Sequence, residues 1–178
     1  ALEAAPADIE LREGRMRIAG TDRSVTFAEL AGKKPIRVSA TQTPSTPSWP
    51  NGAQVAEVEV DPDTGEVALV ALTSCDDIGR IINHTIVEGQ IHGGLTMGLA
   101  PALLEEIQYD ENGNIHGGSF MDYLLPTAIE TPKWETAKTT TPSPHHPIGA
   151  KGVGESATVG APAAIANAVV DALSHLGV

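Results

Sequence analysis

The stretch VAEVEVDPDTGEVALVALT, residues 55–73, determines the fold class that this sequence predicts. Apolar and polar residues alternate through 55–60 and again through 66–73, which is the period of a β-strand with one buried face. Between them, residues 61–65 combine aspartate, proline and glycine as tight turns do. The stretch therefore predicts an antiparallel hairpin in a sheet that buries one of its faces.

Two helical patterns follow the hairpin. Residues 85–106 form the first, although glycines inside it each cost about 1 kcal/mol relative to alanine. Most of these glycines lie near one stripe, which indicates close approach of another backbone or of a bulky cofactor: Gly89, Gly93, Gly94 and Gly98. Residues 157–176 are rich in alanine with apolar residues at helical spacing, which predicts a helix packed on a sheet. The fold class is thus α+β, with antiparallel strands, a glycine-rich long helix and a C-terminal helix.

The N-terminal part is expected to be a separate, smaller element. Residues 8–18 predict a hairpin, and residues 24–30 predict a short capped helix that ends near Gly32. Residues 39–53 are rich in Thr, Ser and Pro and predict an extended loop. We therefore divide the chain into a lead-in, residues 1–50, and a principal domain, residues 51–178.

Composition and charge exclude several classes of protein. The net charge of −12 argues against a nucleic-acid partner, which needs a basic patch. No stretch approaches the roughly 18 apolar residues that cross a bilayer. Residues 1–6 lack an initiator Met and the features of a signal peptide, which predicts a fragment or a processed chain. The single Cys75 excludes an internal disulfide and favours a reducing compartment, so the cytoplasm is expected, with the periplasm as the alternative.

The segment GAKGVGES, residues 149–156, carries the most chemical information. Its glycines let backbone amides approach an anionic group, and the helix N-terminus behind them favours negative charge. It is not a phosphate loop, because Lys151 comes too early and Glu155 stands where the phosphate would lie. Glu155 also fits the first turn of a helix, where acidic residues are stabilising. The local pattern alone therefore leaves the role of Glu155 open.

Four ordered stretches resemble the molybdenum hydroxylases, the family of xanthine dehydrogenase and aldehyde oxidase. The stretch GAKGVGESATVGAPAA (149–164) is similar to the motif in which a glycine-flanked glutamate faces the metal. The other three follow the family's order: VAEVEVDPDTGEVALV (55–70), DDIGRIIN (76–83) and VEGQIHGGLTMGLAPALLEE (87–106). The resemblance identifies the chain as the C-terminal part of the molybdopterin-binding large subunit.

The resemblance implies a chemistry and a set of site residues. The cofactor is molybdenum–molybdopterin in its cytosine dinucleotide form, and the reaction hydroxylates an aldehyde or N-heteroaromatic substrate with water. In the family a pterin dithiolene holds the metal, so no protein side chain is expected to be a metal ligand, and a glutamate beside the metal is the general base. Carried over to this sequence, that base is Glu155. The cofactor-binding residues carried over are Gln90, Lys151, Gly152, Val153 and Gly154.

The resemblance also implies partners. Iron–sulfur clusters and usually FAD would lie on other chains or domains, because this chain has no set of cysteines to hold such clusters. The expected partners are the rest of the large subunit, an iron–sulfur subunit, a flavin subunit and a small-molecule substrate. The main alternative is a non-catalytic scaffold, or an isolated domain that does not bind the cofactor by itself. A general phosphate-binding module is a weaker alternative.

Other residues are expected to be structural. The Asp76-Asp77 pair could be a catalytic carboxylate pair, but a loop start or helix cap is the preferred interpretation. Arg80 and Asn83 are weaker cofactor candidates, and His84 stands where the family often has proline. The proline-punctuated segment 126–148, including the adjacent His145-His146, is expected to be a long loop that is functional or covers another chain.

Overall fold

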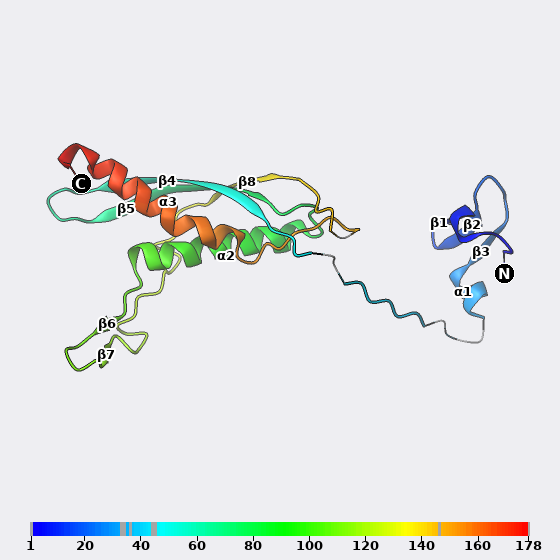
Figure 1. Cartoon of the computed structure of the whole chain (residues 1–178), viewed down its shortest axis with the longest axis horizontal. Coiled ribbons are helices and arrows are strands. Elements are labelled where there is room, and N and C mark those ends of the chain that lie inside the picture. Colours follow the sequence, from blue (N-terminus) through cyan, green and yellow to red (C-terminus); the bar gives the residue numbers. More distant parts are fainter. Residues whose placement is uncertain (1, 33–34, 36, 44–45, 146, 178) are drawn as a thin grey trace. The chain divides into compact units, whose positions relative to one another are not determined.

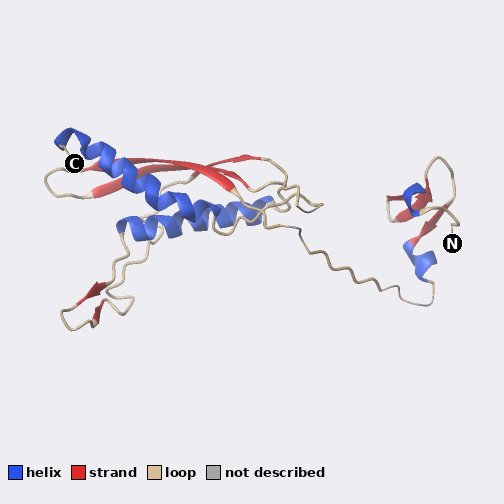
Figure 2. Cartoon of the chain, viewed as in Figure 1, coloured by secondary structure: helices blue, strands red, loops and turns tan. Residues whose placement is uncertain are grey.

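The computed structural model describes residues 2–32, 35, 37–43, 46–145 and 147–177. The chain forms two compact units, Ala1–Thr43 and Pro44–Val178. Figures 1 and 2 show the helices and strands of each unit.

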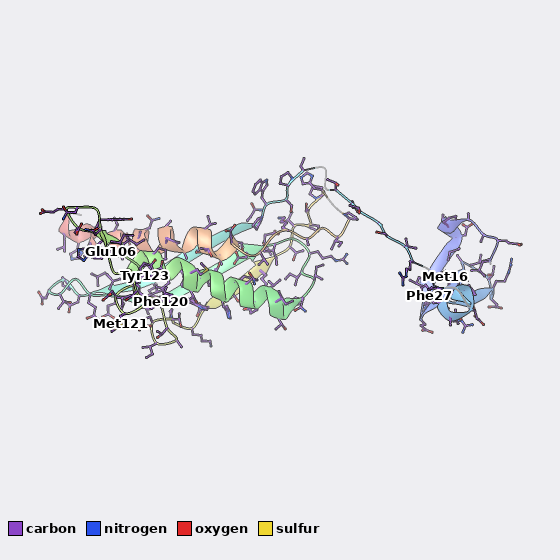
Figure 3. The ribbon with its side chains drawn as sticks, turned by 90° about the horizontal axis from the view of Figure 1, so that it is seen from below. Met16, Phe27, Glu106, Phe120, Met121 and Tyr123 are labelled. Atoms are coloured by element: carbon purple, nitrogen blue, oxygen red, sulfur yellow. The ribbon has the colours of Figure 1, made fainter. Side chains whose placement is uncertain are left out.

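The first unit is a small antiparallel sheet followed by one short helix. Its elements are η1 (Pro6–Asp8), β1 (Ile9–Arg12), β2 (Arg15–Ile18), β3 (Ser24–Thr26) and α1 (Phe27–Ala31), and the strand order is β1-β2-β3. The predicted hairpin is confirmed, with Glu13 and Gly14 at positive φ in its turn. The predicted helix is wrong in its first turn, because residues 24–26 pair with β2 instead. Met16 and Phe27 supply large apolar side chains of this unit (Figure 3).

Helix α1 begins where the sequence provides a cap. The Thr26 hydroxyl accepts a hydrogen bond from the backbone N–H of Glu29 at 3.1 Å. The Glu29 carboxylate in turn accepts one from the backbone N–H of Thr26 at 2.8 Å. This reciprocal capping box satisfies two N–H groups that a helix start otherwise leaves free. Gly32 ends the helix with a positive φ, as predicted.

The second unit is built on the predicted hairpin. Strands β4 (Asn51–Val60) and β5 (Val67–Asp77) pair antiparallel, with Val60 opposite Val67 and Asn51 opposite Asp77. The hairpin is confirmed, and both strands are longer than expected at the end away from the turn. Residues 51–53 therefore belong to a strand and not to the preceding loop. Asp76 and Asp77 likewise end β5 rather than starting a loop.

A third strand joins this sheet where only a loop was expected. Strand β8 (Glu135–Thr139) pairs parallel with β5, from Thr73 opposite Glu135 to Asp77 opposite Thr139. The expectation of a loop throughout 126–148 is thus wrong for these five residues, which lie between Pro132 and Pro142 and contain no proline. Their hydrogen-bond partner is distant in sequence, so no local pattern indicated the pairing. The sheet order is β4-β5-β8.

Helices α2 (His84–Leu103) and α3 (Ser156–Leu173) pack on one face of this sheet, and η2 (Ser174–Leu176) follows α3 (Figure 2). Helix α2 ends at Leu103, three residues before the predicted end. The buried core joins one residue of β5 and one of the loop after it to both helices: Leu72, Ile78, Val87, Ile91, Leu95, Leu99, Ala157, Ala161 and Ile165. Burial of this apolar surface provides most of the stability of the unit.

The glycines of α2 separate into two groups. A Cβ placed on Gly98 would lie 2.5 Å from the Cβ of Ala161, and one on Gly94 would lie 3.1 Å from the Cβ of Ala157. These two glycines therefore allow the backbones of α2 and α3 to approach closely. A Cβ on Gly89 or Gly93 would meet no atom within 4 Å. The predicted close approach of another backbone is confirmed for Gly94 and Gly98.

Helix α3 is more apolar than the sequence analysis allowed. Together with η2, as residues Ser156–Leu176, it is long and apolar enough to cross a membrane by length and composition alone. The statement that no stretch approaches this limit is therefore wrong. One stripe of α3, formed by Ala157, Ala161 and Ile165, is buried against α2 and the sheet. Core helices meet the same criterion of length and composition, so it is weak evidence for a membrane span.

A small hairpin extends from the end of α2. Strands β6 (Gln108–Tyr109) and β7 (Ile115–His116) pair around a turn in which Asp110 accepts hydrogen bonds from the backbone of Asn112 and Asn114. Figure 1 shows this hairpin projecting away from the sheet and the two long helices. The Tyr123 hydroxyl donates a hydrogen bond to the Glu105 carboxylate at 2.9 Å, which holds the segment after β7 close to the end of α2 (Figure 3).

Candidate functional site

Glu155 lies at the junction between the glycine-rich segment and helix α3. It is the N-cap residue of that helix, with φ −120° and ψ 2°, and its side chain makes no capping hydrogen bond. The side chain is exposed and has no hydrogen bond or ion pair with any residue that the structure describes. Its carboxylate therefore stands at the N-terminal end of an 18-residue helix and is free to act on a ligand.

Gln90 of α2 lies beside this segment. A Cβ added at Gly154 would be 3.7 Å from Oε1 of Gln90, so the amide and the glycine are neighbours. Gln90 is exposed. Its amide can both donate and accept hydrogen bonds. The structure thus brings together Gln90, Gly154 and the residue next to it, Glu155, from elements that are far apart in the sequence.

Lys151 is neither a surface charge nor a free side chain. Its Nζ lies 3.0 Å from Oδ1 of Asp77, and the two side chains are 8% and 9% exposed. Its backbone N–H donates to the carbonyl of Ile78 at 2.7 Å. The ammonium and the backbone N–H of Lys151 are therefore both engaged within the fold, which leaves its carbonyl oxygen to contact a ligand.

Asp76 and Asp77 are buried at the end of β5. Asp76 accepts hydrogen bonds from the hydroxyls of Ser74 at 2.7 Å and Ser156 at 2.6 Å. Hydrogen bonds from Thr141, from the backbone of Gly79 and from Lys151 hold the pKa of Asp77 well below its ordinary value. Neither a catalytic pair nor a helix cap describes this arrangement. Both carboxylates instead bind groups at the two ends of the segment that carries Glu155.

The loop before α2 is positioned by the same segment. The backbone N–H of Arg80 donates to the carbonyl of Gly149 at 3.0 Å, and Gly79 forms an isolated bridge with Ala150.

The Asn83 side chain caps α2 by accepting from Ile86 N–H at 3.0 Å, which gives it a structural role. His84 is the first helical residue, a position that accepts proline as readily as other residues. A cavity of about 260 Å³ opens between this loop and residues 150–153.

Glu88 joins α2 to β8. Its carboxylate accepts hydrogen bonds from Lys138 and from the Thr136 hydroxyl, and Nε2 of His92 lies 3.1 Å away. The hydrogen bonds from Lys138 and Thr136 lower the pKa of Glu88 to about 2. Strand β8, which the sequence did not predict, is therefore attached to helix α2 two residues before Gln90.

We expect Glu88 to contribute to the acid sensitivity of the fold. Because its pKa is lowered from 4.5 to about 2, its contribution to stability is present above pH 4.5 and is lost as the pH falls toward 2. The Glu88→Gln variant should therefore lose less stability than the wild type between about pH 5 and about pH 3. Urea unfolding at both pH values measures this. Glu57→Gln, at an exposed position of β4, is the control and should keep the acid sensitivity of the wild type.

The cysteine and histidine candidates do not form a site with Glu155 in the part of the chain that the structure describes. Cys75 lies within β5 and is half-buried, and His116 is exposed in β7. His146 falls outside the described residues. In the described part of the chain, no three His, Cys, Asp or Glu side chains gather to hold a metal ion. A metal held by an organic cofactor would need polar protein groups and open space rather than such a cluster.

The described surface near Glu155 offers those features. A Cβ on Gly152 would meet no atom within 4 Å, so space is open beside that backbone. Gln90 supplies an exposed amide, and Gly152 and Gly154 are exposed as well. The residues present therefore fit a large polar organic group that approaches the backbone of 152–154.

Comparison with known proteins gives the family. The model of the molybdopterin cofactor-binding domain matches residues 1–132. The chain belongs to this family. The likeness extends beyond the matched residues, because it is 43% identical over 188 aligned positions, covering 99% of its length, to the carbon monoxide dehydrogenase large chain of Hydrogenophaga pseudoflava. The resemblance to molybdenum hydroxylases is thereby confirmed, and the segment with Glu155 lies within this alignment.

Two further relatives agree with this assignment. The nicotine 6-hydroxylase large subunit of Paenarthrobacter nicotinovorans is 40% identical over 99% of the chain. The crystal structure of quinoline 2-oxidoreductase from Pseudomonas putida 86 superposes with a TM-score of 0.90 at 39% identity, covering 99% of this chain and 24% of that one. The chain also spans only 23% of each of the two curated relatives. It corresponds to a segment of a molybdenum hydroxylase large subunit, in an α+β fold shared with those proteins.

The comparisons are less specific about the type of enzyme. The three relatives are named for carbon monoxide, nicotine and quinoline, and none of these is an aldehyde or xanthine. Membership of the family therefore supports an oxidoreductase and leaves the aldehyde oxidase or xanthine dehydrogenase type undetermined.

Proposed function

We propose that this chain forms the C-terminal part of the cofactor-binding domain in the large subunit of a molybdenum hydroxylase, with Glu155 as the general base. The observation that carries the proposal is the unpaired, exposed carboxylate of Glu155, whose neighbour Gly154 lies next to the Gln90 amide. A carboxylate at a helix N-terminus with no partner in the described fold contributes no contact to packing. We infer that this carboxylate serves a ligand.

Each residue of the site has its own role in the proposed reaction. A bound molybdenum cofactor would supply an acidified water and a two-electron acceptor for the substrate. Glu155 accepts the proton of that water, and a carboxylate is basic enough for this because the water is acidified. Gln90, the carbonyl of Lys151 and the backbone of Gly152, Val153 and Gly154 would hydrogen-bond the organic part of the cofactor and fix its orientation.

The proposed substrate is an N-heteroaromatic compound or an aldehyde, hydroxylated with oxygen from water. The relatives named for nicotine and quinoline favour the heteroaromatic class. Oxidation of carbon monoxide is a second candidate, because the chain is 43% identical to a carbon monoxide dehydrogenase large chain. Reduction of an artificial dye by each of the three substrate types separates these possibilities.

The proposal includes a cofactor and partners that lie outside this chain. We propose the cytosine dinucleotide form of molybdopterin, together with iron–sulfur clusters and FAD on partner chains or domains. The partners are the rest of the large subunit, an iron–sulfur subunit and a flavin subunit, and the proposed compartment is the cytoplasm. The relatives, described as large chains or large subunits, support an assembly of this kind.

Elemental analysis of the purified assembly that contains this chain tests the proposal. We expect stoichiometric molybdenum, and intact-mass spectrometry should find the remaining length of the large subunit, either in the same polypeptide or in companion chains. Companion chains without molybdenum, in an assembly that reduces no dye, would instead establish the scaffold alternative. The measurement is direct because it needs no knowledge of the substrate.

A further inference from the structure

Two consecutive carboxylates hold both ends of the loop that presents Glu155. Oδ1 of Asp77 is 3.0 Å from Nζ of Lys151, just before the loop, and Oδ1 of Asp76 accepts from the Ser156 hydroxyl at 2.6 Å, just after it. Successive side chains of a strand point to opposite faces, so neighbouring residues of β5 can reach partners on different sides. The two ends of residues 152–155 are thereby tied to one rigid strand end.

Both attachments are buried, and additional hydrogen bonds to the two carboxylates stabilise them. Asp76 is fully buried and also accepts from Ser74, and Asp77 also accepts from the backbone N–H groups of Gly79 and Thr141. Hydrogen bonds to charged groups are stronger than those between neutral groups, and burial strengthens them further. The two carboxylates therefore cannot shift without breaking several bonds at once.

Between the attachments, Val153 packs against the hydrophobic core, and the loop adds few hydrogen bonds of its own. Within it the structure gives only weak backbone bonds, from Ser156 N–H to Val153 and from Val159 N–H to Glu155, each at 3.3 Å. Gly152 and Gly154 add backbone freedom that any ordered state must overcome. The position of the Glu155 carboxylate therefore depends on where the two ends are held.

We propose that Asp76 and Asp77 are positioning residues for Glu155, holding the loop of residues 152–155 at both ends so that the carboxylate stays aimed at the reacting group. This inference rests on the proposed role of Glu155 as general base. A base must lie within hydrogen-bond reach of the proton that it accepts, and small displacements lower the rate steeply. The carboxylates act through Glu155 and touch neither substrate nor cofactor.

The test uses Asp77→Asn and Ser156→Ala in the assembled enzyme, each made in the wild type and in a Glu155→Gln background. In the wild type each should lower kcat by about tenfold or more with unchanged KM. The rate is expressed per bound molybdenum, because residues 152–154 also contact the cofactor in the proposed function. Deuterium uptake of the peptide that spans residues 149–156 should rise. In the Glu155→Gln background neither variant should lower the residual rate further, because the base that they position is absent.

Two controls separate positioning from general destabilisation. Ser156→Thr keeps the hydroxyl and should restore most of the activity that Ser156→Ala loses. Ser119→Ala removes a comparable serine–aspartate hydrogen bond, to Asp122, in the segment after β7 and should leave kcat and the deuterium uptake of 149–156 unchanged. Because Ser156→Ala removes only one hydroxyl, it remains informative if Asp77→Asn fails to fold.

The outcomes distinguish this inference from the proposed function. If Glu155→Gln slows turnover but the variants reduce the rate by the same factor in both backgrounds, the two carboxylates are structural and the positioning role is wrong. If deuterium uptake does not change, the loop is not held by these contacts. If Glu155→Gln leaves turnover intact, the proposed base is wrong and the positioning role fails with it.

Discussion

Replacement of Glu155 by glutamine in the assembled enzyme is expected to lower kcat by at least about a hundredfold, the lower range for the loss of a general base. Glutamine has nearly the same shape but cannot accept the proton. Because the Glu155 side chain makes no hydrogen bond or ion pair with the described residues, the fold should not depend on its charge. Molybdenum content and the midpoint of thermal unfolding should therefore match the wild type.

Steady-state kinetics with a saturating substrate measures this effect. Two further variants serve as comparisons. Glu155→Asp keeps a carboxylate with shorter reach and should fall between the wild type and Glu155→Gln. Glu59→Gln, at another exposed glutamate of the same unit, should leave the rate unchanged. Near-normal turnover of a fully loaded Glu155→Gln enzyme contradicts the assignment of Glu155 as the base.

The second large effect is expected at Gly98. Valine at this position should lower the free energy of unfolding by about 2–3 kcal/mol, the upper part of the range for overpacking a core. Its Cβ would lie 2.5 Å from the Cβ of Ala161 and 3.2 Å from the carbonyl oxygen of Thr158. Neither neighbour is the end of a flexible side chain, so α2 and α3 would have to move apart. Urea unfolding of the chain measures the change.

Gly93 on the same helix provides the matched control. A Cβ there meets no atom within 4 Å, so Gly93→Val should change the free energy of unfolding by less than about 0.5 kcal/mol, since valine and glycine differ modestly in helix propensity. A similar loss at both positions would mean that helix propensity, and not the contact between α2 and α3, explains the result.

Local patterns were sufficient for much of the fold. The alternation of residues 55–73 predicted β4, β5 and their turn, since strand period and turn chemistry are both short-range properties. The glycine-rich helix and the C-terminal helix were found for the same reason. The errors fell at element ends and at β8, whose pairing with β5 joins residues 62 positions apart, such as Thr73 and Glu135. No window of sequence contains both partners.

The candidate site shows the same division. Glycine spacing and resemblance to a family singled out Glu155, Gln90 and the segment between Lys151 and Gly154. Neither could indicate that Gln90 lies beside Gly154, because that contact depends on the packing of α2 near the start of α3. The ion pair of Lys151 was not predictable either, since its buried partner Asp77 lies 74 residues earlier.

What the sequence determined by itself was the α+β class, the hairpin, the two helices and the segment that carries the chemistry. All of these depend on residues within about one helix or strand length of each other. Only the tertiary structure decided that Asp76 and Asp77 bind the two ends of that segment. Such contacts form when distant residues are buried together, and a buried carboxylate needs donors that only the folded chain can bring to it.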